Sequence, residues 1–407
     1  MKNILLIMPY GSVGGMERLA HTFYTYYKQK GYFVKAVKLI CLKSDIIHFG
    51  EDELWLSTKD FGEMSPAKRL LFYTKAPLRL RKIIKKYNIT HSISFGDMTN
   101  MFSSLTATSE FKVASIHALK SAEFQNKTPL NSIFKFGFRS TYKSFDKTVC
   151  ISQAIAKDLV EECGYKFDNL DVIYNPHPVD TIRQRANEDR EVFTKMKIPS
   201  GKAIVFVGRL SLQKSPWYLL NAFCLAKQKD PDLHLICIGD GEPRVREYID
   251  RLIEYRNIQD VHFLGRKSNP YPYIEQAGVL ALSSFYEGTP NVIVEAIALQ
   301  TPVVTTKCTE GILELMCVGS HTPEHHEYWI RTEAGLITPG VFNGELSIPS
   351  FIAKEFAAEE IALSKALLAV VSGQVDVKNT LNQHDTKLLA KFDLETVATD
   401  YLRNQAK

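Results

Sequence analysis

Two carboxylates, Glu287 and Glu295, stand eight residues apart on either side of a Gly-Thr-Pro turn. The turn leads into an apolar run that predicts a helix beginning near Asn291. The first turn of a helix carries unpaired backbone N–H groups and the positive end of the helix dipole, so it can hold an anion such as a phosphate. The two carboxylates could then bind hydroxyl groups on either side of that anion. The alternative is an ordinary helix start, with Pro290 near its first position and two solvated glutamates.

Two cations follow an apolar run at residues 203–207. Arg209 and Lys214 stand five residues apart in one predicted loop. They can converge on a diphosphate, because Arg presents a planar fork of donors and Lys a point charge. The alternative interpretation is a solvated basic loop.

Two further candidates lie in the first half of the chain. His117 directly follows a predicted strand at residues 112–116, which places it at the carboxyl edge of a sheet. The glycine-rich turn over residues 11–15 lacks the spacing of a dinucleotide fingerprint and the Lys of a Walker loop. Its glycines would let backbone N–H groups approach a phosphate. A lone histidine is more often structural and a glycine turn more often a tight connection, so both roles stay open at this point.

These residues need elements to position them, and the chain alternates predicted strands with helices. The predicted strands cover residues 4–8, 33–40, 46–48, 90–95, 112–116 and 147–151, and then 203–207, 233–238, 261–264, 279–282 and 303–305. A Pro-containing segment at 171–178 separates the two series. Such alternation predicts α/β architecture with two doubly wound parallel sheets, whose ligands bind beyond the carboxyl ends of the strands.

Composition limits the class of protein. The seven cysteines are scattered and form no Cys-x-x-Cys pair, which is typical of reduced thiols and not of disulfides. The N-terminal apolar run of five residues is too short for a signal peptide or a membrane span. Asp230-Pro-Asp232 resembles a metal motif but precedes a predicted strand, at the wrong end of the sheet. We therefore expect no metal site.

Positive charge is concentrated in the first half. Residues 1–175 contain 25 Lys and Arg against 16 Asp and Glu, whereas the whole chain has a net charge of +5. Residues 64–87 and 134–145 interleave basic with apolar side chains. Both stretches could dock on an anionic membrane, or they could be amphipathic helices with a solvated basic face. No recognisable nucleic-acid-binding module accompanies the charge, so we expect no nucleic acid.

The Glu-x7-Glu stretch resembles the signature of retaining nucleotide-sugar glycosyltransferases of family 4, of the bacterial polysaccharide and lipopolysaccharide type. Further matches cover nearly the whole chain: Gly14-Gly15-Met16-Glu17, Gly208-Arg209 with Lys214, Gly265-Arg266, and Gly335-Leu-Ile-Thr-Pro. The resemblance implies the GT-B fold, with two Rossmann-like domains facing across a cleft. Residues 1–173 would bind the acceptor and 174–388 the donor, while a helix in 389–407 would pack back on the first domain.

The resemblance also implies the site residues. Catalysis would involve His117, Glu287, Arg209 and Lys214. Donor binding would involve Gly14, Gly15, Arg209, Lys214, Gly265, Arg266, Glu287, Gly288, Thr289, Pro290, Asn291, Val292 and Glu295. Protein cations and helix dipoles would neutralise the diphosphate, so we expect no cofactor and no metal.

The expected activity is transfer of a hexose or N-acetylhexosamine, with retention, from a nucleoside diphosphate sugar to a glycan or lipid-linked acceptor in surface polysaccharide synthesis. A UDP-sugar is the expected donor. We expect a cytoplasmic protein, peripheral on the inner face of the cell membrane. Two alternatives stay open: another GT-B enzyme, such as a glycan phosphorylase or a sugar-nucleotide epimerase, and a non-catalytic membrane-associated partner subunit. The sequence assigns no role to residues 321–328 and 341–356, which look like insertions.

Overall fold

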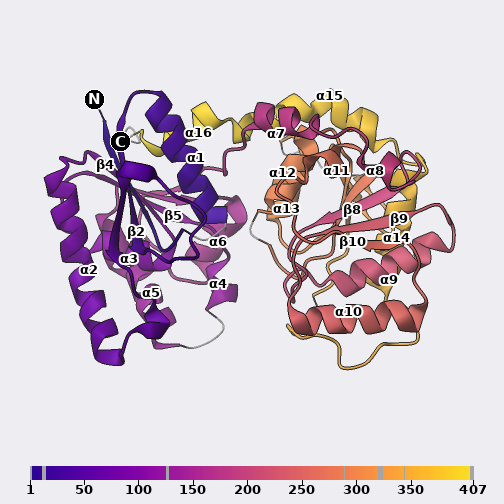
Figure 1. Ribbon diagram of the computed structural model, residues 1–407, viewed down its shortest axis with the longest axis horizontal. Helices are drawn as coiled ribbons and strands as arrows, with labels where there is room; N and C mark the ends of the chain where they lie inside the picture. Colours follow the sequence, from indigo (N-terminus) through magenta and orange to yellow (C-terminus); the bar gives the residue numbers. More distant parts are fainter. Residues whose placement is uncertain are drawn as a thin grey trace. The chain divides into compact units, whose positions relative to one another are not determined.

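The computed structural model describes residues 2–11, 15–124, 128–287, 289–319, 324–342 and 344–403. The chain divides into two compact units, each built on one β-sheet (Figure 1). The first unit comprises Met1–Pro176 with Leu394–Lys407, and the second comprises His177–Asp393. These divisions lie within six residues of the expected domain boundaries at 173 and 388.

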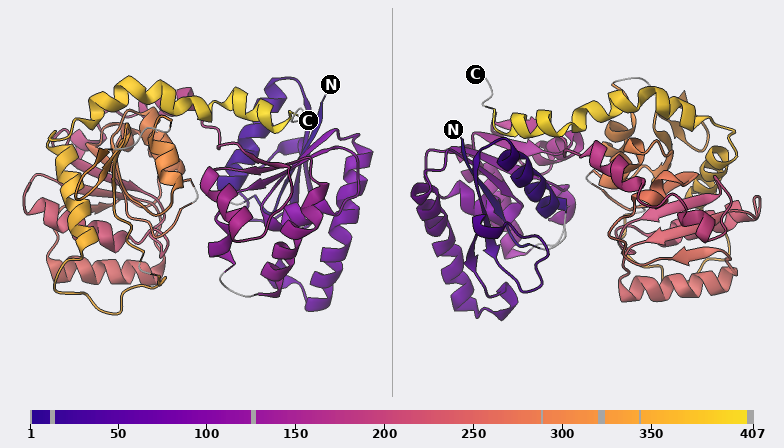
Figure 2. Two further views of the ribbon diagram at one scale, coloured as in Figure 1. Left: turned by 180° about the vertical axis from the view of Figure 1, so that it is seen from behind. Right: turned by 45° about the horizontal axis from the view of Figure 1, so that its top comes forward.

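The first unit contains a seven-stranded sheet in the order β3-β2-β1-β4-β5-β6-β7. All of its neighbouring strands pair in parallel. The strands are β1 (Asn3–Met8), β2 (Phe33–Ile40), β3 (Glu53–Ser57), β4 (His91–Phe95), β5 (Phe111–Ile116), β6 (Lys147–Cys150) and β7 (Leu170–Val172). Helices cover both faces (Figure 2), so the central strands are largely buried, and β1 is apolar from Ile4 to Met8.

The prediction of a strand at residues 46–48 is wrong. The backbone N–H groups of Ile46 and Ile47 both donate to the Gly11 carbonyl, at 2.9 and 3.0 Å. These two hydrogen bonds hold Ile46 and Ile47 against Gly11, so the segment does not pair with a strand of the sheet. The third strand of the series is therefore β3, further along the chain.

Alternate side chains of β1 enter two different cores. Ile4 and Leu6 face the core that includes α1 (Gly15–Gln29) and α16 (Leu394–Tyr401). Leu5 and Ile7 face the core that includes α2 (Pro66–Lys86) and Phe102 of α3 (Asp97–Ser104). A third core lies beneath α5 (Pro129–Arg139) and α6 (Gln153–Glu161), and α4 (Lys120–Glu123) lies nearby.

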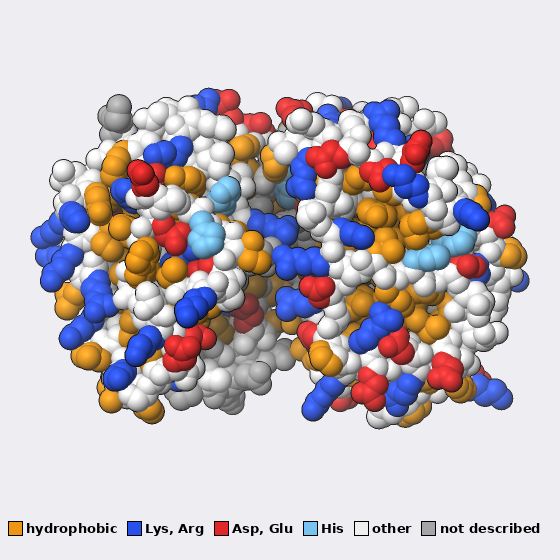
Figure 3. Space-filling model, viewed as in Figure 1, with side chains coloured by type: hydrophobic (Ala, Val, Ile, Leu, Met, Phe, Trp, Pro, Cys, Tyr) orange, Lys and Arg blue, Asp and Glu red, His pale blue; other side chains and the backbone are white. Residues whose placement is uncertain are grey.

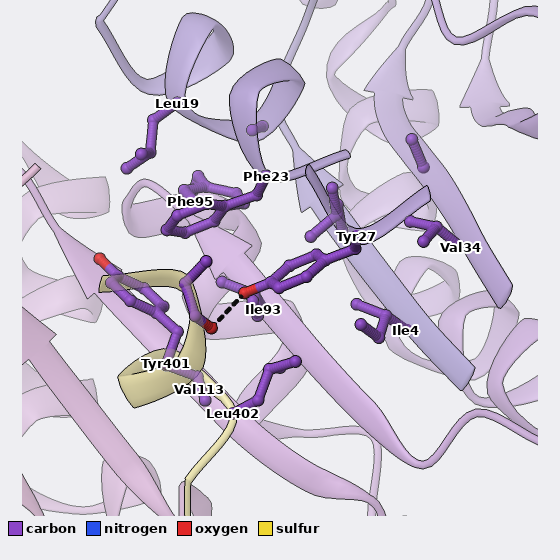
Figure 4. Packing of buried hydrophobic residues seen from close by; sticks show 14 of the residues in the cluster. Ile4, Leu19, Phe23, Tyr27, Val34, Ile93, Phe95, Val113, Tyr401 and Leu402 are labelled. Carbon is purple, nitrogen blue, oxygen red and sulfur yellow. Dashed lines mark hydrogen bonds between the residues drawn. The ribbon is translucent and has the colours of Figure 1, made fainter. Parts of the chain in front are cut away.

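The C-terminal helix α16 belongs to the first unit (Figure 4). The Tyr401 ring packs edge-on against Phe23 at 4.8 Å, and its hydroxyl lies 2.8 Å from Ser115 Oγ. Tyr27 donates its hydroxyl hydrogen to the Ala398 carbonyl at 2.8 Å. Since both tyrosine side chains are buried, these contacts satisfy hydroxyls that would otherwise be costly to desolvate.

The second unit contains an eight-stranded sheet in the order β10-β9-β8-β11-β12-β15-β14-β13. The strands are β8 (Ala203–Val207), β9 (His234–Ile238), β10 (Val261–Phe263), β11 (Val279–Leu282), β12 (Val303–Thr306), β13 (Glu324–His325), β14 (Ile330–Arg331) and β15 (Gly335–Thr338). Six strands are parallel, and β14 and β13 extend the sheet in antiparallel fashion. The described part of the unassigned segment 321–328 thus belongs to an edge hairpin.

Nine α-helices lie in the described part of the second unit. They are α7 (Val179–Ala186), α8 (Val192–Lys195), α9 (Pro216–Lys227), α10 (Pro243–Arg256), α11 (Tyr271–Glu275), α12 (Asn291–Ala298), α13 (Gly311–Met316), α14 (Ala358–Val371) and α15 (Val377–Leu389). Arg256 donates to the carbonyls of Ala353 and Lys354, which fixes the unassigned loop before α14 against the end of α10. Across the described residues, no helix combines the length and the apolar character needed to cross a membrane.

Candidate functional site

Two loops at the carboxyl edge of the second sheet lie side by side because β8 and β11 are neighbouring strands. The backbone joins them through the Phe285 N–H, which donates to the Gln213 carbonyl at 2.8 Å. Lys214 from the first loop forms an ion pair with the carboxylate of Glu287 from the second. The fold thus brings together two predicted site residues that are 73 positions apart in the chain.

The carboxylate of Glu287 is buried, and the residue is only 7% exposed. Ser284 Oγ donates to Glu287 Oε1 at 2.7 Å, and Gln213 Nε2 donates to the neighbouring Tyr286 carbonyl at 3.1 Å. A buried carboxylate is strongly destabilising unless a cation and hydrogen bonds compensate it. Lys214 therefore neutralises Glu287, a role that its expected function as a diphosphate ligand did not include.

Arg209 lies in the same loop but in a different environment. Its side chain is exposed and forms no hydrogen bond or ion pair with any described residue. The backbone beside it is fixed, because the Leu210 N–H donates to the Asp240 carbonyl at 2.7 Å and the Glu242 N–H donates to the Leu210 carbonyl at 2.9 Å. The guanidinium is thus free to bind an anion from an ordered backbone.

Glycines pack the loops after β8, β9 and β10 against one another. Gly239 has a φ of +147°, and a Cβ at this position would lie 2.0 Å from the Gly208 carbonyl oxygen. Its N–H donates to the Gly265 carbonyl at 2.9 Å. Gly265 has a φ of +62°, and the exposed Arg266 follows it. Only glycine permits this close approach of backbones.

The helix predicted near Asn291 begins at that residue, as α12. Pro290 is its N-cap, and the side chain of Val292 is buried. The Thr289 hydroxyl just before the helix is buried and has no partner among the described residues. Glu295 lies in the second turn of α12 and is partly buried. Gly288 lies outside the described residues, as does Gly14 in the first unit.

In the first unit, Gly11 after β1 contacts a charged network that sequence reasoning missed. The Gly11 N–H donates to Asp45 Oδ1 at 2.9 Å. The other oxygen of Asp45 lies 3.1 Å from Lys38 Nζ, which also lies 3.0 Å from Glu53 Oε1. Lys38 is fully buried. A lysine inside the apolar strand β2 was the sequence signal that could have predicted a buried ion pair here. Gly15 is exposed and begins α1.

His117 follows β5 at the carboxyl edge of the first sheet. Its Nε2 is buried without a partner among the described residues, and its ring lies 6.1 Å from Phe95. Burial, with a smaller contribution from Lys120, lowers the pKa of His117 to about 3. The imidazole is therefore neutral near pH 7, where it can donate or accept a hydrogen bond but not supply a charge.

Asp97, the first residue of α3, forms an ion pair with Lys120. Lys120 Nζ lies 2.9 Å from its carboxylate and 2.6 Å from that of Glu123. Lys120 is buried, so this three-membered group is needed to compensate its charge. Asp97 therefore has a structural role in this arrangement.

A cavity of about 690 Å³ in the second unit lies away from these loops. Its lining includes Gly201, Gly278 and Pro302, which precede β8, β11 and β12. It therefore opens at the amino edge of the sheet, whereas Arg209, Lys214, Glu287 and the start of α12 lie at the carboxyl edge.

Two family models match the chain. The model described as Glycosyltransferase Family 4 matches residues 13–181, and the model described as Glycosyl transferases group 1 matches residues 201–334. Together the two ranges cover about three quarters of the chain.

Curated relatives agree with these models. An uncharacterized glycosyltransferase of Methanocaldococcus jannaschii is 25% identical over 67% of this chain and 66% of the relative. The N-acetylgalactosamine-N,N'-diacetylbacillosaminyl-diphospho-undecaprenol 4-alpha-N-acetylgalactosaminyltransferase of Campylobacter jejuni is 30% identical over 46% of this chain and 49% of the relative. The chain thus spans about half to two thirds of the length of these two relatives.

Solved structures show the same architecture over the whole chain. HepE of Anabaena, in complex with UDP and glucose, is 15% identical with a TM-score of 0.71, covering 99% of this chain and 98% of that one. Sucrose-phosphate synthase from Thermosynechococcus elongatus is 16% identical with a TM-score of 0.74, covering 98% and 97%. At such identities the likeness shows the fold, with the two Rossmann-like units of GT-B proteins. With both units matched by glycosyltransferase models, the chain belongs to the family 4 type of glycosyltransferases.

Proposed function

We propose that this protein transfers a hexose or N-acetylhexosamine, with retention, from a UDP-sugar to a hydroxyl group of a glycan or lipid-linked acceptor. The observation that supports this most is the assembly of Arg209, the Lys214–Glu287 pair and the start of α12 at one sheet edge. It combines cations for a diphosphate with a buried carboxylate for sugar hydroxyls. The Campylobacter jejuni relative, named for transfer to an undecaprenol-linked glycan, supports the class of acceptor.

In this proposal the protein stabilises the departing diphosphate. Arg209 contributes two donors from its planar fork, and the N–H groups at the start of α12 bind a phosphate oxygen. An ammonium group has three donors, so Lys214 can contact a phosphate while it stays bound to Glu287. These groups together supply electrostatic stabilisation without a metal.

The remaining site residues would orient the sugar and the nucleoside. Glu287 accepts a hydrogen bond from a sugar hydroxyl, and Glu295 accepts one from the ribose. The neutral His117 would hydrogen-bond to a sugar hydroxyl. The chain presents no obvious covalent nucleophile, so retention would proceed by attack on the same face, with the leaving phosphate oxygen accepting the acceptor's proton.

Substitution of Arg209 tests the donor site. Arg209→Ala should lower turnover by two or more orders of magnitude, because a lost transition-state contact of this kind costs about 3 kcal/mol. Arg251→Ala is the matched control, since Arg251 is an exposed arginine on α10 in the same unit. Binding of UDP, measured by calorimetry, should weaken in the first variant only. Equal turnover in both variants contradicts the assignment.

The two alternatives are separable in one assay. Incubation with UDP-sugars, with and without a glycan acceptor, distinguishes transfer from other GT-B chemistry. Conversion of one UDP-sugar into another without acceptor would favour an epimerase, and release of sugar 1-phosphate from a glycan by inorganic phosphate would favour a phosphorylase. UDP binding without any turnover would favour a partner subunit.

Metal dependence is tested with EDTA. We expect activity to persist in excess EDTA. Complete loss of activity, with restoration by Mn²⁺ or Mg²⁺, would contradict the metal-independent mechanism.

We further propose that the first unit docks on an anionic membrane through a basic apolar surface on α2 and α5. No acidic residue lies between 66 and 86, and none of the basic residues in that range forms an ion pair with a described carboxylate. Leu70, Leu78 and, on α5, Phe136 are each more than half exposed. Figure 3 shows Lys and Arg side chains interleaved with hydrophobic ones over α2. Such a surface can place lysines at lipid headgroups and apolar side chains below them.

Vesicle binding tests this surface. Sedimentation should show binding to anionic but not to neutral vesicles, weakened by salt, because each surface cation contributes about 1 kcal/mol within a Debye length. Arg81→Glu with Lys85→Glu should weaken this binding. Lys229→Glu with Lys378→Glu changes the net charge equally on the second unit and should preserve binding. Salt-independent binding to neutral vesicles, or equal loss in both double variants, would contradict the proposal.

A further inference from the structure

Three side chains with metal-binding atoms meet at the amino edge of the second sheet. His234 is the first residue of β9, His262 lies in β10, and Asp260 immediately precedes β10. The two strands are parallel neighbours, with Ile236 opposite His262. His234 Nδ1 lies 3.1 Å from His262 Nε2 and 3.8 Å from Asp260 Oδ1. All three donor atoms lie within 4.8 Å of one another.

These separations suit a tetrahedral metal ion. Two nitrogens at the usual Zn–N distance of about 2.0–2.1 Å from one tetrahedral zinc are separated by about 3.3 Å. The observed distance of 3.1 Å between the two nitrogens is close to that value. The distance of 3.8 Å between His234 Nδ1 and Asp260 Oδ1 would have to shorten slightly. Rotation of side chains at the strand ends can supply it.

The contacts of Asp260 leave one of its carboxylate oxygens facing the imidazoles. Lys227 Nζ lies 2.7 Å from Asp260 Oδ2, the oxygen that does not face His234. Lys227 also donates hydrogen bonds to the Pro231 and Leu233 carbonyls.

The exposure of Asp260 to solvent and the types of ligand atom limit which ions can bind. The Asp260 side chain is 43% exposed, so water can occupy a fourth position. Two imidazoles and one carboxylate suit Zn²⁺, Co²⁺ or Ni²⁺, whereas Mg²⁺ and Ca²⁺ prefer sites built of oxygen atoms. The neighbouring Asp230 pairs with Lys202 at 2.6 Å and so is not one of the ligands.

We propose that His234, His262 and Asp260 bind one divalent transition-metal ion of the zinc type, with water completing the coordination. The ion would replace the direct hydrogen bond between the two imidazoles and link β9 to β10. Because the site lies at the edge of the sheet opposite Arg209, Lys214 and Glu287, it would stabilise the second unit without entering the transfer reaction. The proposal is independent of the proposed function.

Metal titration of tag-free full-length protein tests the site. We expect one saturable site for Zn²⁺ by calorimetry and a melting temperature that rises with Zn²⁺ concentration, since a ligand that binds only the folded state stabilises it. Bound Co²⁺ should give the strong visible absorption of tetrahedral coordination. Mg²⁺ should produce neither effect. Absence of saturable Zn²⁺ and Co²⁺ binding by the unaltered protein overturns the proposal.

Single substitutions locate the ion. His234→Asn and His262→Asn should each raise the Kd for Zn²⁺ at least tenfold. Asp260→Asn should also weaken Zn²⁺ binding. This variant should fold normally, because Asp260 has a φ of +57° and asparagine tolerates this conformation. His325→Ala, which removes an exposed histidine from the edge hairpin, is the control and should bind as the unaltered protein does. Unchanged Zn²⁺ affinity in all three ligand variants, each folded by circular dichroism, would overturn the assignment.

Discussion

Replacement of Lys214 by methionine separates its structural contribution from its proposed contact with the donor. Lys214→Met keeps the length of the side chain and removes its charge, leaving Glu287 buried with Ser284 Oγ as its nearest donor. Breaking a buried ion pair by removing one partner costs about 3–5 kcal/mol. The Lys214 side chain is 17% exposed, so we expect the lower end, about 3 kcal/mol. For a unit of this size, that corresponds to a fall in melting temperature of about 6–12 °C.

The assay is thermal unfolding followed by tryptophan fluorescence. Trp217 and Trp329 are both buried in the second unit, whereas Trp55 of the first unit is exposed, so the signal reports mainly the unit that contains the pair. Arg209→Met is the matched control, because this exposed side chain has no partner among the described residues. Its stability should change by less than about 0.5 kcal/mol.

A second substitution tests the cause of the effect. Glu287→Gln in the Lys214→Met background removes the unpaired charge and should recover part of the lost stability. If Lys214→Met melts at the temperature of the unaltered protein, or if Glu287→Gln destabilises it further, the buried ion pair does not stabilise the donor loops as argued.

Three other predictions concern packing inside each unit and the burial of His117. Gly239→Ala should lower the melting temperature of the second unit in calorimetry, because the added Cβ would lie 2.0 Å from the Gly208 carbonyl oxygen; an unchanged melting temperature would show that the loops separate easily. Tyr401→Ala should destabilise the first unit by about 3–5 kcal/mol in urea unfolding, through loss of a fully buried ring, and Tyr401→Phe should cost only the hydrogen bond to Ser115. His117 has a folded pKa of about 3, below its unfolded value, so the unfolded state binds more protons between these values and stability should fall as pH falls from about 6.5 towards 3. His117→Asn should reduce that slope in unfolding measured across the pH range, and an NMR titration of His117 with a midpoint above pH 6 would contradict the burial argument.

Local sequence determined which segments form strands or helices in most cases, and it determined where α12 of the site begins. Apolar runs such as residues 4–8 specify buried parallel strands, because both of their faces must be covered. Pro290 followed by an apolar run fixed the start of α12 at Asn291, since proline fits the beginning of a helix. The predicted strand at residues 46–48 failed because its backbone N–H groups bond to the Gly11 carbonyl, a partner 35 residues away that no local pattern reveals.

Tertiary structure alone decided which charged groups meet. Lys214 pairs with Glu287 because β8 and β11 are neighbours in the sheet, and strand order is not encoded in the periodicity of either strand. In the same way, spacing in the chain gave no sign that His234 and His262 would stack at the start of two adjacent strands. Periodicity reports which face of an element is buried, whereas contacts between elements depend on how sheets order their strands and how loops pack above them.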